Sequence, residues 1–184
     1  MKKFTVAILV NNQFGVLNRV TSMFRRRAFN IISLTVSETE SEEFSRITVQ
    51  SEGDGVKKEQ LINQLYKLPD IVSVAELSNE ETVNRELLLI KIKNASETRE
   101  DVRSASDAYE GKVVDYTKES IMIQMIGDSR KIDNFVNLMK EFGILEICRT
   151  GVVSLQRGSS TIRRVTNLSS WLSLWESWHG LSRD

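Results

Sequence analysis

The chain has 184 residues, which suits one mid-sized domain or two small ones. Its 25 basic and 25 acidic side chains cancel, and a neutral chain has no electrostatic footprint for nucleic acid or for an anionic membrane surface. The single cysteine, Cys148, excludes an intrachain disulfide framework and fits a reducing cytoplasm. Hydrophobic residues make up 40% of the chain, and no apolar run approaches the roughly 20 residues of a membrane span, so we expect a soluble globular protein.

The first 77 residues predict the order strand, helix, strand, strand, helix, strand. The apolar run at residues 4–10 is interpreted as a strand and not as a signal peptide, because Asn11 and Asn12 end it without a cleavage site. Asp54 is the expected N-cap of the second helix, and Pro69 is expected to end it. The strands are predicted at residues 4–10, 31–37, 44–51 and 71–77, and the first helix at 15–29 with Val16, Val20, Met23 and Phe24 on one face.

The second half repeats this order. Its predicted elements are strands at residues 87–92, 112–116, 121–126 and 144–155, the last bent at Gly151, a helix at 99–109 and a helix with the stripe Ile132, Phe135, Val136 and Met139. The fold class is therefore α+β, with two ferredoxin-like βαββαβ units at residues 1–78 and 79–158. The polar stretch within residues 78–85 is the expected linker, and residues 159–184 form a tail.

The second strand of the first unit has apolar side chains on both of its faces. Ile31, Ile32, Leu34 and Val36 do not alternate with polar residues as they would in a half-exposed strand. A ferredoxin-like unit has helices on only one face of its sheet, so the other face needs a cover. We expect a second sheet or a second protomer to provide it.

No catalytic or metal-binding pattern is evident. His179 is the only histidine, and Cys148 follows the apolar Ile147, which favours a small buried hydrophobe over a reactive thiol. No group of His, Cys, Asp and Glu has metal-ligand spacing, and neither a GxGxxG motif nor a P-loop is present. The strands that would carry RNA-stacking aromatics in this fold have none. We expect no catalytic residue, no metal site and no nucleic-acid partner.

The informative segment joins the first strand to the first helix. Gly15 permits an unusual turn and a close approach of the backbone to a ligand. The N–H groups of Val16 and Leu17 follow it at the start of the helix, where the positive end of the dipole favours a carboxylate. Spacing alone is also compatible with an ordinary strand-to-helix turn.

An α-amino acid would need further groups besides a carboxylate site. Its ammonium requires oxygen acceptors, which the side chains of Asn12 and Asn30 offer. A short aliphatic side chain requires an apolar lining, which Ile31, Ile32 and Leu34 offer.

Several runs of the sequence closely resemble the ACT domain and the second domain of acetohydroxyacid synthase (acetolactate synthase) small subunits. The resemblance covers about residues 1–158 and is most specific in the run Arg-Arg-x-Phe-Asn-Ile-x-Ser-Leu-Thr-Val that ends at Val36. The other matching runs are Asn12-x-x-Gly15-Val16-Leu17, Ser45-Arg46-Ile47-Thr48-Val49, Gln64-Leu65-Tyr66-Lys67-Leu68, Arg85-Glu86-Leu87-Leu88-Leu89-Ile90-Lys91 and Arg149-Thr150-Gly151-Val152-Val153-x-Leu155-x-Arg157-Gly158.

The resemblance implies a regulatory chain that has no activity of its own. It implies feedback inhibition by a branched-chain amino acid, usually valine, bound where two ACT domains of a homodimer pair edge to edge. Asn12, Gly15, Val16 and Leu17 of one protomer and Asn30 and Ile31 of the other would hold the effector. The partner would be a cytoplasmic large subunit that carries thiamine diphosphate, Mg²⁺ and FAD and condenses pyruvate, while this chain binds none of these cofactors.

Two alternatives and two departures from the family pattern accompany this interpretation. The chain could be a free-standing ACT-domain sensor that acts on another enzyme, or a catalyst in its own right. Phe14 stands where a smaller residue is frequent, and Asn11 where an acidic one is common, which affects ligand identity more than fold.

Trp171, Trp175 and Trp178 have the spacing of a short amphipathic helix in the tail, which would either dock on another subunit or fold back over the second domain.

Overall fold

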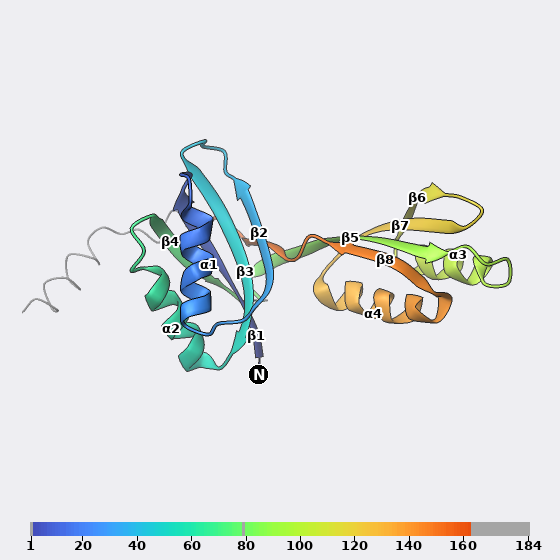
Figure 1. Ribbon diagram of the computed structural model, residues 1–184, viewed down its shortest axis with the longest axis horizontal. Helices are drawn as coiled ribbons and strands as arrows, with labels where there is room; N and C mark the ends of the chain where they lie inside the picture. The colour runs from blue at the N-terminus through green and yellow to red at the C-terminus, as the bar shows by residue number, and fades with distance from the viewer. Residues whose placement is uncertain (1, 79, 163–184) are drawn as a thin grey trace, which may run out of the picture.

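The computed structural model describes residues 2–78 and 80–162, which form two α+β units side by side in an elongated molecule (Figure 1). The first unit contains β1 (Lys2–Asn11), α1 (Val16–Arg26), β2 (Ile31–Glu38), β3 (Phe44–Gly53), α2 (Gly55–Leu65) and β4 (Ile71–Leu77). The second contains β5 (Thr82–Lys93), α3 (Arg99–Ala108), β6 (Lys112–Tyr116), β7 (Ser120–Gly127), α4 (Ser129–Met139), a 3-10 turn (Lys140–Phe142), β8 (Ile144–Arg149) and β9 (Val153–Gln156). The predicted α+β class with two βαββαβ units is confirmed.

Each unit has one antiparallel sheet with two helices on one of its faces (Figure 1). The strand order is β2-β3-β1-β4 in the first sheet and β6-β7-β5-β8 in the second. In both units the first strand along the chain lies at the centre of the sheet, as the ferredoxin-like order requires. In the first sheet β2 is an edge strand, with one side of its backbone unpaired in the single chain.

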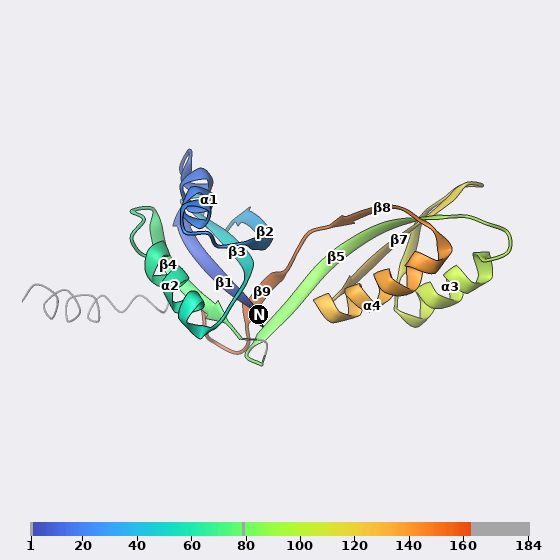
Figure 2. The same cartoon turned by 60° about the horizontal axis from the view of Figure 1, so that its bottom comes forward.

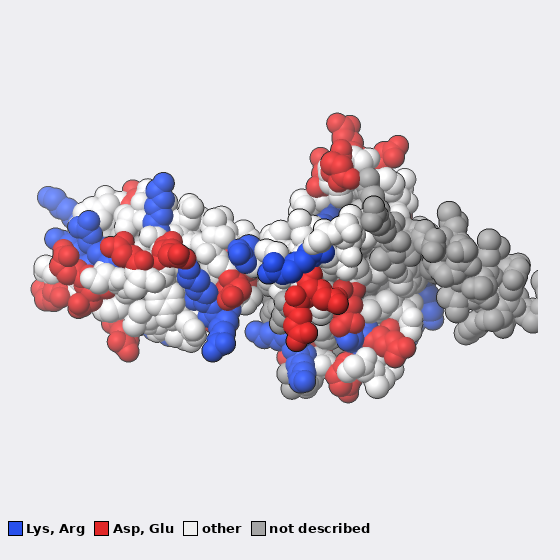
Figure 3. All heavy atoms as spheres, turned by 180° about the vertical axis from the view of Figure 1, so that it is seen from behind, with Lys and Arg blue, Asp and Glu red and all other residues white. Residues whose placement is uncertain are grey.

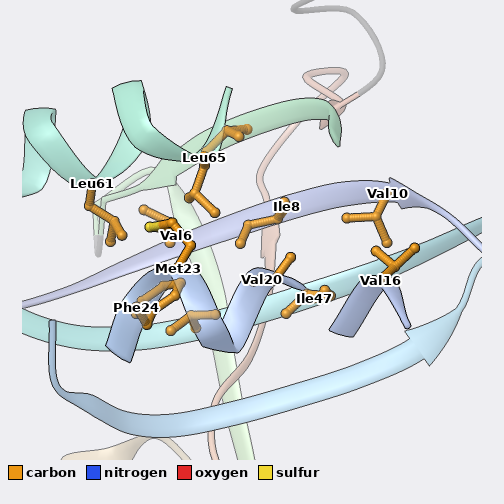
Figure 4. Close-up of a cluster of buried hydrophobic side chains, with 12 residues drawn as sticks. Val6, Ile8, Val10, Val16, Val20, Met23, Phe24, Ile47, Leu61 and Leu65 are labelled. Atoms are coloured by element: carbon orange, nitrogen blue, oxygen red, sulfur yellow. The ribbon is translucent and has the colours of Figure 1, made fainter. Parts of the chain in front are cut away.

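The core of the first unit lies between its sheet and helices α1 and α2 (Figure 4). All four residues of the predicted stripe on α1 are buried, namely Val16, Val20, Met23 and Phe24. The helix is shorter than predicted because Gly15 precedes it in the left-handed region, at φ 80°, and Ala28, at φ 55°, follows its end. From α2 the core receives Leu61 and Leu65, and this helix begins after Asp54, whose side chain accepts a 2.8 Å hydrogen bond from the Lys57 N–H as predicted.

The second unit has a separate core between its sheet and helices α3 and α4. The stripe predicted on α4 is confirmed, with Ile132, Phe135 and Met139 buried and Val136 packed against them. On β5 alternate residues, Leu88, Ile90 and Ile92, point into this core. In the described part of the chain, no helix is both long and apolar enough to cross a membrane.

The predicted linker and the predicted last strand differ from the structure for one reason. Residues 82–85, expected to be linker, form the beginning of β5, because Thr82–Arg85 pair with β9. The expected single strand at 144–155 is divided into β8 and β9 around Gly151, which has φ 80°. Both pieces pair with β5, β8 with residues 88–92 and β9 with residues 82–85. Long-range pairing of this kind is not visible in local periodicity.

The helix-free face of the first sheet is partly covered by residues 150–162, here called the return segment (Figure 2). At its end Ile162 is buried against apolar residues of β1 and β4, namely Ala7, Leu9, Ala75 and Leu77. The Ser73 hydroxyl donates a 2.8 Å hydrogen bond to the Ile162 carbonyl. The cover expected from a second sheet or a second protomer comes, over this part of the face, from the same chain, and it includes β9, which pairs with β5 of the second unit.

Cys148 is exposed, so its interpretation as a buried hydrophobe is also wrong. The register pairs Cys148 with Leu89, between Leu88 and Ile90, which both face the helices. Neighbouring residues of a strand point to opposite faces, so Cys148 lies on the helix-free face of the second sheet. The three tryptophans of the tail lie outside the described residues.

Candidate functional site

The N-terminus of α1 is formed by a glycine and carries no neutralising side chain. Gly15 occupies the N-cap position at φ 80° without a capping side-chain hydrogen bond, and the first turn contains no acidic residue. The Val16 N–H reaches the Gln13 carbonyl at 3.3 Å, whereas the Leu17 N–H lies in the first helical turn, where no intrahelical acceptor exists. The positive end of the helix dipole is therefore open to an anion such as a carboxylate.

Asn12 is oriented by three hydrogen bonds beside this helix end. Its amide nitrogen donates to Glu38 Oε1 at 3.1 Å and to the Glu42 carbonyl at 3.0 Å. Its amide oxygen accepts a 3.0 Å hydrogen bond from the Ser45 hydroxyl. The side chain thus connects the end of β1 to the β2–β3 turn, and Glu38 brings a carboxylate to within hydrogen-bond distance of it.

The β2–β3 turn adds further negative charge. Figure 3 shows acidic side chains gathered at this tip of the first unit, and elsewhere on that face acidic and basic side chains are mixed. The acidic residues of the turn are Glu38, Glu40, Glu42 and Glu43. A site that combines an open helix N-terminus with nearby carboxylates has complementary ends for the carboxylate and the ammonium of an amino acid.

Apolar side chains border the same end of the unit. Phe14 is fully exposed, at 103% of its reference area, and Leu17 is 41% exposed on the first turn of α1. Together with Asn12, Gln13 and Gly15 they line an open depression. Val16, in contrast, is 3% exposed and belongs to the core, so it can offer a ligand its backbone and not its side chain.

Asn30 and Ile31 lie at the opposite end of α1, and a single chain does not bring them to the first group. The Asn30 amide nitrogen has a 3.5 Å contact with Glu52 Oε1, while its carbonyl accepts a 2.6 Å hydrogen bond from the Ser51 hydroxyl. Ile31 packs against the first core. The six predicted site residues therefore form two separate groups within one protomer.

The expected apolar lining is also divided. Ile31 and Leu34 pack against the first core, but Ile32 lines a cleft between the two units, on the other face of the sheet. The register of β2 against β3 shifts between Ile31 and Ser33, and this bulge brings Ile31 to the same face as Leu34. Leu34 also borders this cleft, whereas Ile31 does not, so the three residues do not form one common lining.

Two residues near the site were missed from the sequence. Glu38 and Ser45 hold the side chain of Asn12, although they are 26 and 33 positions away along the chain. The negative charge of the stretch at residues 38–43 is the signal in the sequence that points to Glu38. Within residues 2–78 and 80–162, no group of three or more His, Cys, Asp and Glu residues could hold a metal ion.

Comparisons with known proteins agree with this arrangement. The family model of the AHAS small subunit-like ACT domain matches residues 6–73, and the model of the small subunit of acetolactate synthase matches residues 85–158. The chain is 41% identical over 159 residues to the acetolactate synthase small subunit of Bacillus subtilis, covering 85% of this chain and 92% of that one. It is 39% identical over 158 residues to that of Haemophilus influenzae, covering 85% and 97%.

A solved structure extends the agreement to three dimensions. The crystal structure of the acetolactate synthase small subunit from Thermotoga maritima superposes with a TM-score of 0.80 at 34% sequence identity, covering 87% of this chain and 100% of that one. Both units of the fold are included in this overlap. The chain therefore belongs to the family of acetolactate synthase small subunits and is a regulatory chain, not a catalytic one.

Proposed function

We propose that this small subunit binds a branched-chain amino acid, valine first among them, and thereby confers feedback inhibition on an acetolactate synthase catalytic subunit. The observation that carries the proposal is the open N-terminus of α1 beside the Asn12–Glu38 pair. The helix end suits the ligand carboxylate, and the Asn12 amide oxygen with the Glu38 carboxylate suits its ammonium. The exposed Phe14 and Leu17 offer contact to a short aliphatic side chain.

The site is complete only in a homodimer that pairs two β2 strands. In a two-fold antiparallel pair, the beginning of one β2 lies beside the end of the other. The beginning of β2 carries Asn30 and Ile31, and its end carries Glu38, which contacts Asn12. Such pairing therefore places Asn30 and Ile31 of one protomer near Asn12, Gly15 and the first turn of α1 in its partner.

Exposed apolar groups along this edge support the pairing. Val36 is 40% exposed although it pairs with the fully buried Ile47, and Leu17 is 41% exposed nearby on α1. An uncovered edge strand flanked by apolar side chains is a surface that a second copy would cover. Amino acid bound between protomers would favour the dimer by its binding free energy.

In this proposal the two units have different tasks. Residues 1–78 bind the effector, residues 79–158 form the second ferredoxin-like domain, and residues 159–184 are a tail whose described part ends at residue 162. The partner is the cytoplasmic large subunit, which carries thiamine diphosphate, Mg²⁺ and FAD and condenses pyruvate. The small subunit raises the activity of that partner and binds none of these cofactors.

The direct test is the activity of a reconstituted complex of this chain and the large subunit of the same organism, titrated with valine, leucine and isoleucine. We expect activation without effector and saturable inhibition by at least one of the three. Sedimentation of the chain alone should show a dimer that valine stabilises. A monomer at micromolar concentration with and without the amino acid would contradict the shared site, and an unresponsive complex would contradict the proposed regulation.

A further inference from the structure

The return segment connects the edge strand of the first sheet to the second unit through a continuous set of contacts. On β2 the Thr35 hydroxyl donates a 3.1 Å hydrogen bond to the Thr150 carbonyl. The Ser33 hydroxyl accepts a 3.2 Å hydrogen bond from the Val152 N–H. Farther along, Arg46 of β3 donates to the Ser154 carbonyl at 2.8 Å. Backbone groups of three alternate residues of the return segment, 150, 152 and 154, are thus held by side chains of the first sheet.

Gly151 is the point of closest approach between these parts. A Cβ built on Gly151 would lie 2.5 Å from the Ser33 hydroxyl oxygen, too close without a shift of that group, and 3.1 Å from the Ser33 Cβ, which is a tight contact. The φ angle of Gly151 is also 80°, in the region that favours glycine. The return segment can therefore lie against β2 only because residue 151 has no side chain.

Arg149, two residues before Gly151, is anchored in the second unit. Arg149 Nε donates to Glu86 Oε2 at 3.0 Å, and Arg149 Nη1 donates to Asp133 Oδ1 of α4 at 2.7 Å. Glu86 is 4% exposed and also accepts a 2.7 Å hydrogen bond from the Ser129 hydroxyl at the start of α4. Burial alone would lower the pKa of Arg149, but the hydrogen bonds to Glu86 and Asp133 raise it, so the side chain is firmly held as a cation.

The residues that hold the return segment are close in sequence to the proposed effector site on one side and to the second unit on the other. Ser33 and Thr35 lie two and four residues after Ile31, on the strand that begins at the proposed effector site. Arg149 is separated from Gly151 by Thr150, which is bonded to Leu87 of β5 by its hydroxyl oxygen and by its N–H, both at 3.1 Å. Four residues of backbone, 149–152, therefore separate the contacts with β2 from those with β5 and α4.

We propose that the return segment, held between Ser33 on β2 and the Arg149–Glu86 pair of the second unit, relays effector binding from the first unit to the second. The inference rests on the proposed function, since it assumes an effector at the start of β2. An effector changes the partner enzyme only if it favours one of two arrangements of the regulatory chain. The position of β2 against the return segment is the element that differs between these two arrangements.

The test separates effector binding from its consequence. Gly151→Ala introduces the Cβ that the Ser33 hydroxyl excludes, while Gly158→Ala is the matched control, since Gly158 has φ 68° and nothing within 4 Å of an added Cβ. Binding of valine, leucine and isoleucine to the chain is measured by calorimetry, and the maximal inhibition by the effector is measured in the reconstituted complex. We expect Gly151→Ala to keep the effector Kd within about twofold and to lose at least about half of the maximal inhibition. Gly158→Ala should match the wild type in both measurements.

A second substitution keeps the test informative if Gly151→Ala does not fold. Ser33→Ala removes the acceptor of the Val152 N–H without adding volume, and it should reduce maximal inhibition with an unchanged Kd. Combined with Gly151→Ala it removes the nearest clash and should recover part of the inhibition that Gly151→Ala loses. Full inhibition in both folded single variants overturns the relay alone. A wild-type chain that binds none of the three amino acids overturns the proposed function, and with it the relay.

Discussion

The two ferredoxin-like units differ most where the first strand passes into the first helix. In the first unit this turn ends in Gly15, and α1 has neither a capping side chain nor an acidic residue in its first turn. In the second unit the equivalent turn starts at Asn94, and the first turn of α3 contains Glu100 and Asp101. One helix end is thus available to an anion, and the other is already neutralised by its own chain.

The polar groups of the second turn are likewise satisfied internally. Asn94 is 7% exposed, donates a 2.6 Å hydrogen bond to the Thr117 carbonyl and accepts a 2.8 Å hydrogen bond from Arg99 Nε. Asn12, at the corresponding place in the first unit, is exposed, and its amide nitrogen donates to the Glu38 side chain and to the Glu42 carbonyl in the β2–β3 turn. The same fold therefore has an open helix end in one unit and a closed one in the other, and the side chains of one turn decide which.

Arg149→Met should have the largest effect on stability and should leave effector binding unchanged. It removes the cation that Glu86 contacts, and a buried charge left without its partner typically costs 3–5 kcal/mol, so we expect about 3 kcal/mol because Arg149 itself is 33% exposed. Denaturant unfolding of the variant and of Glu86→Gln/Arg149→Met measures this. A double variant no more stable than the single one would contradict the role of the uncompensated carboxylate.

Gly15→Asp should have the largest effect on regulation. The added carboxylate would occupy the helix end that the ligand carboxylate requires, and the loss of a charge-assisted hydrogen bond, about 1.5–3 kcal/mol, corresponds to roughly tenfold or more in affinity. Inhibition titrations of the reconstituted complex give the change. Gly158→Asp is the control, since it has a similar positive φ and open space around it. Equal inhibition of Gly15→Asp and wild type would show that the effector does not use this helix end.

Two asparagine substitutions, one in each unit, should have different effects, one on effector affinity and the other on stability. Asn30→Ala should weaken effector affinity about tenfold. Its cost in stability should be small, because the only side-chain contact that the described structure gives Asn30 is 3.5 Å long. Asn94→Ala should lower the free energy of unfolding by about 1–3 kcal/mol without changing effector affinity, because it removes two hydrogen bonds made by a buried side chain. Lost effector affinity in Asn94→Ala together with lost stability in Asn30→Ala would contradict the different roles of the two turns.

Truncation of the chain should have the smallest effect. Ending the chain after Gly158 removes Ile162 from the helix-free face of the first sheet, whereas ending it after Ile162 does not. We expect the shorter chain to be less stable by about 1–2 kcal/mol, from the apolar area that becomes exposed. If the tryptophans beyond residue 162 dock on another subunit, both truncations lose subunit association. If the tail instead folds back over the second domain, the chain that ends after Ile162 is also less stable than the full chain, and subunit association is retained.

Local patterns in the sequence were sufficient for most of the fold. Helix stripes such as that of Ile132 and Phe135, the Asp54 cap and the strand-length apolar runs predicted the elements in their correct order. They failed where a residue's environment depends on distant pairing. Cys148 is exposed because of its register with Leu89, and residues 82–85 are strand because β9 returns beside them.

The candidate site was predicted less completely for a similar reason. The residues around Gly15 are consecutive, so their spacing indicated a carboxylate site directly. Glu38 and Ser45 reach Asn12 only through the pairing of β1, β2 and β3, and the bulge that turns Ile32 away has no signal in composition. The proposal that Asn30 meets the first group across a dimer comes from family resemblance, and the edge position of β2 supports it.

The central claim is that each effector site is built from two protomers, and a mixture of two defective chains tests it most directly. Gly15→Asp and Asn30→Ala chains are each titrated with the effector by calorimetry, and the two are then mixed, allowed to exchange subunits and titrated again. In a shared-site dimer one of the two sites of each mixed dimer combines an intact Gly15 turn with an intact Asn30. Binding at wild-type affinity should then return to about a quarter of the sites if the chains exchange at random. If no high-affinity sites appear in a mixture shown to contain mixed dimers, each site lies within one protomer and the account is contradicted.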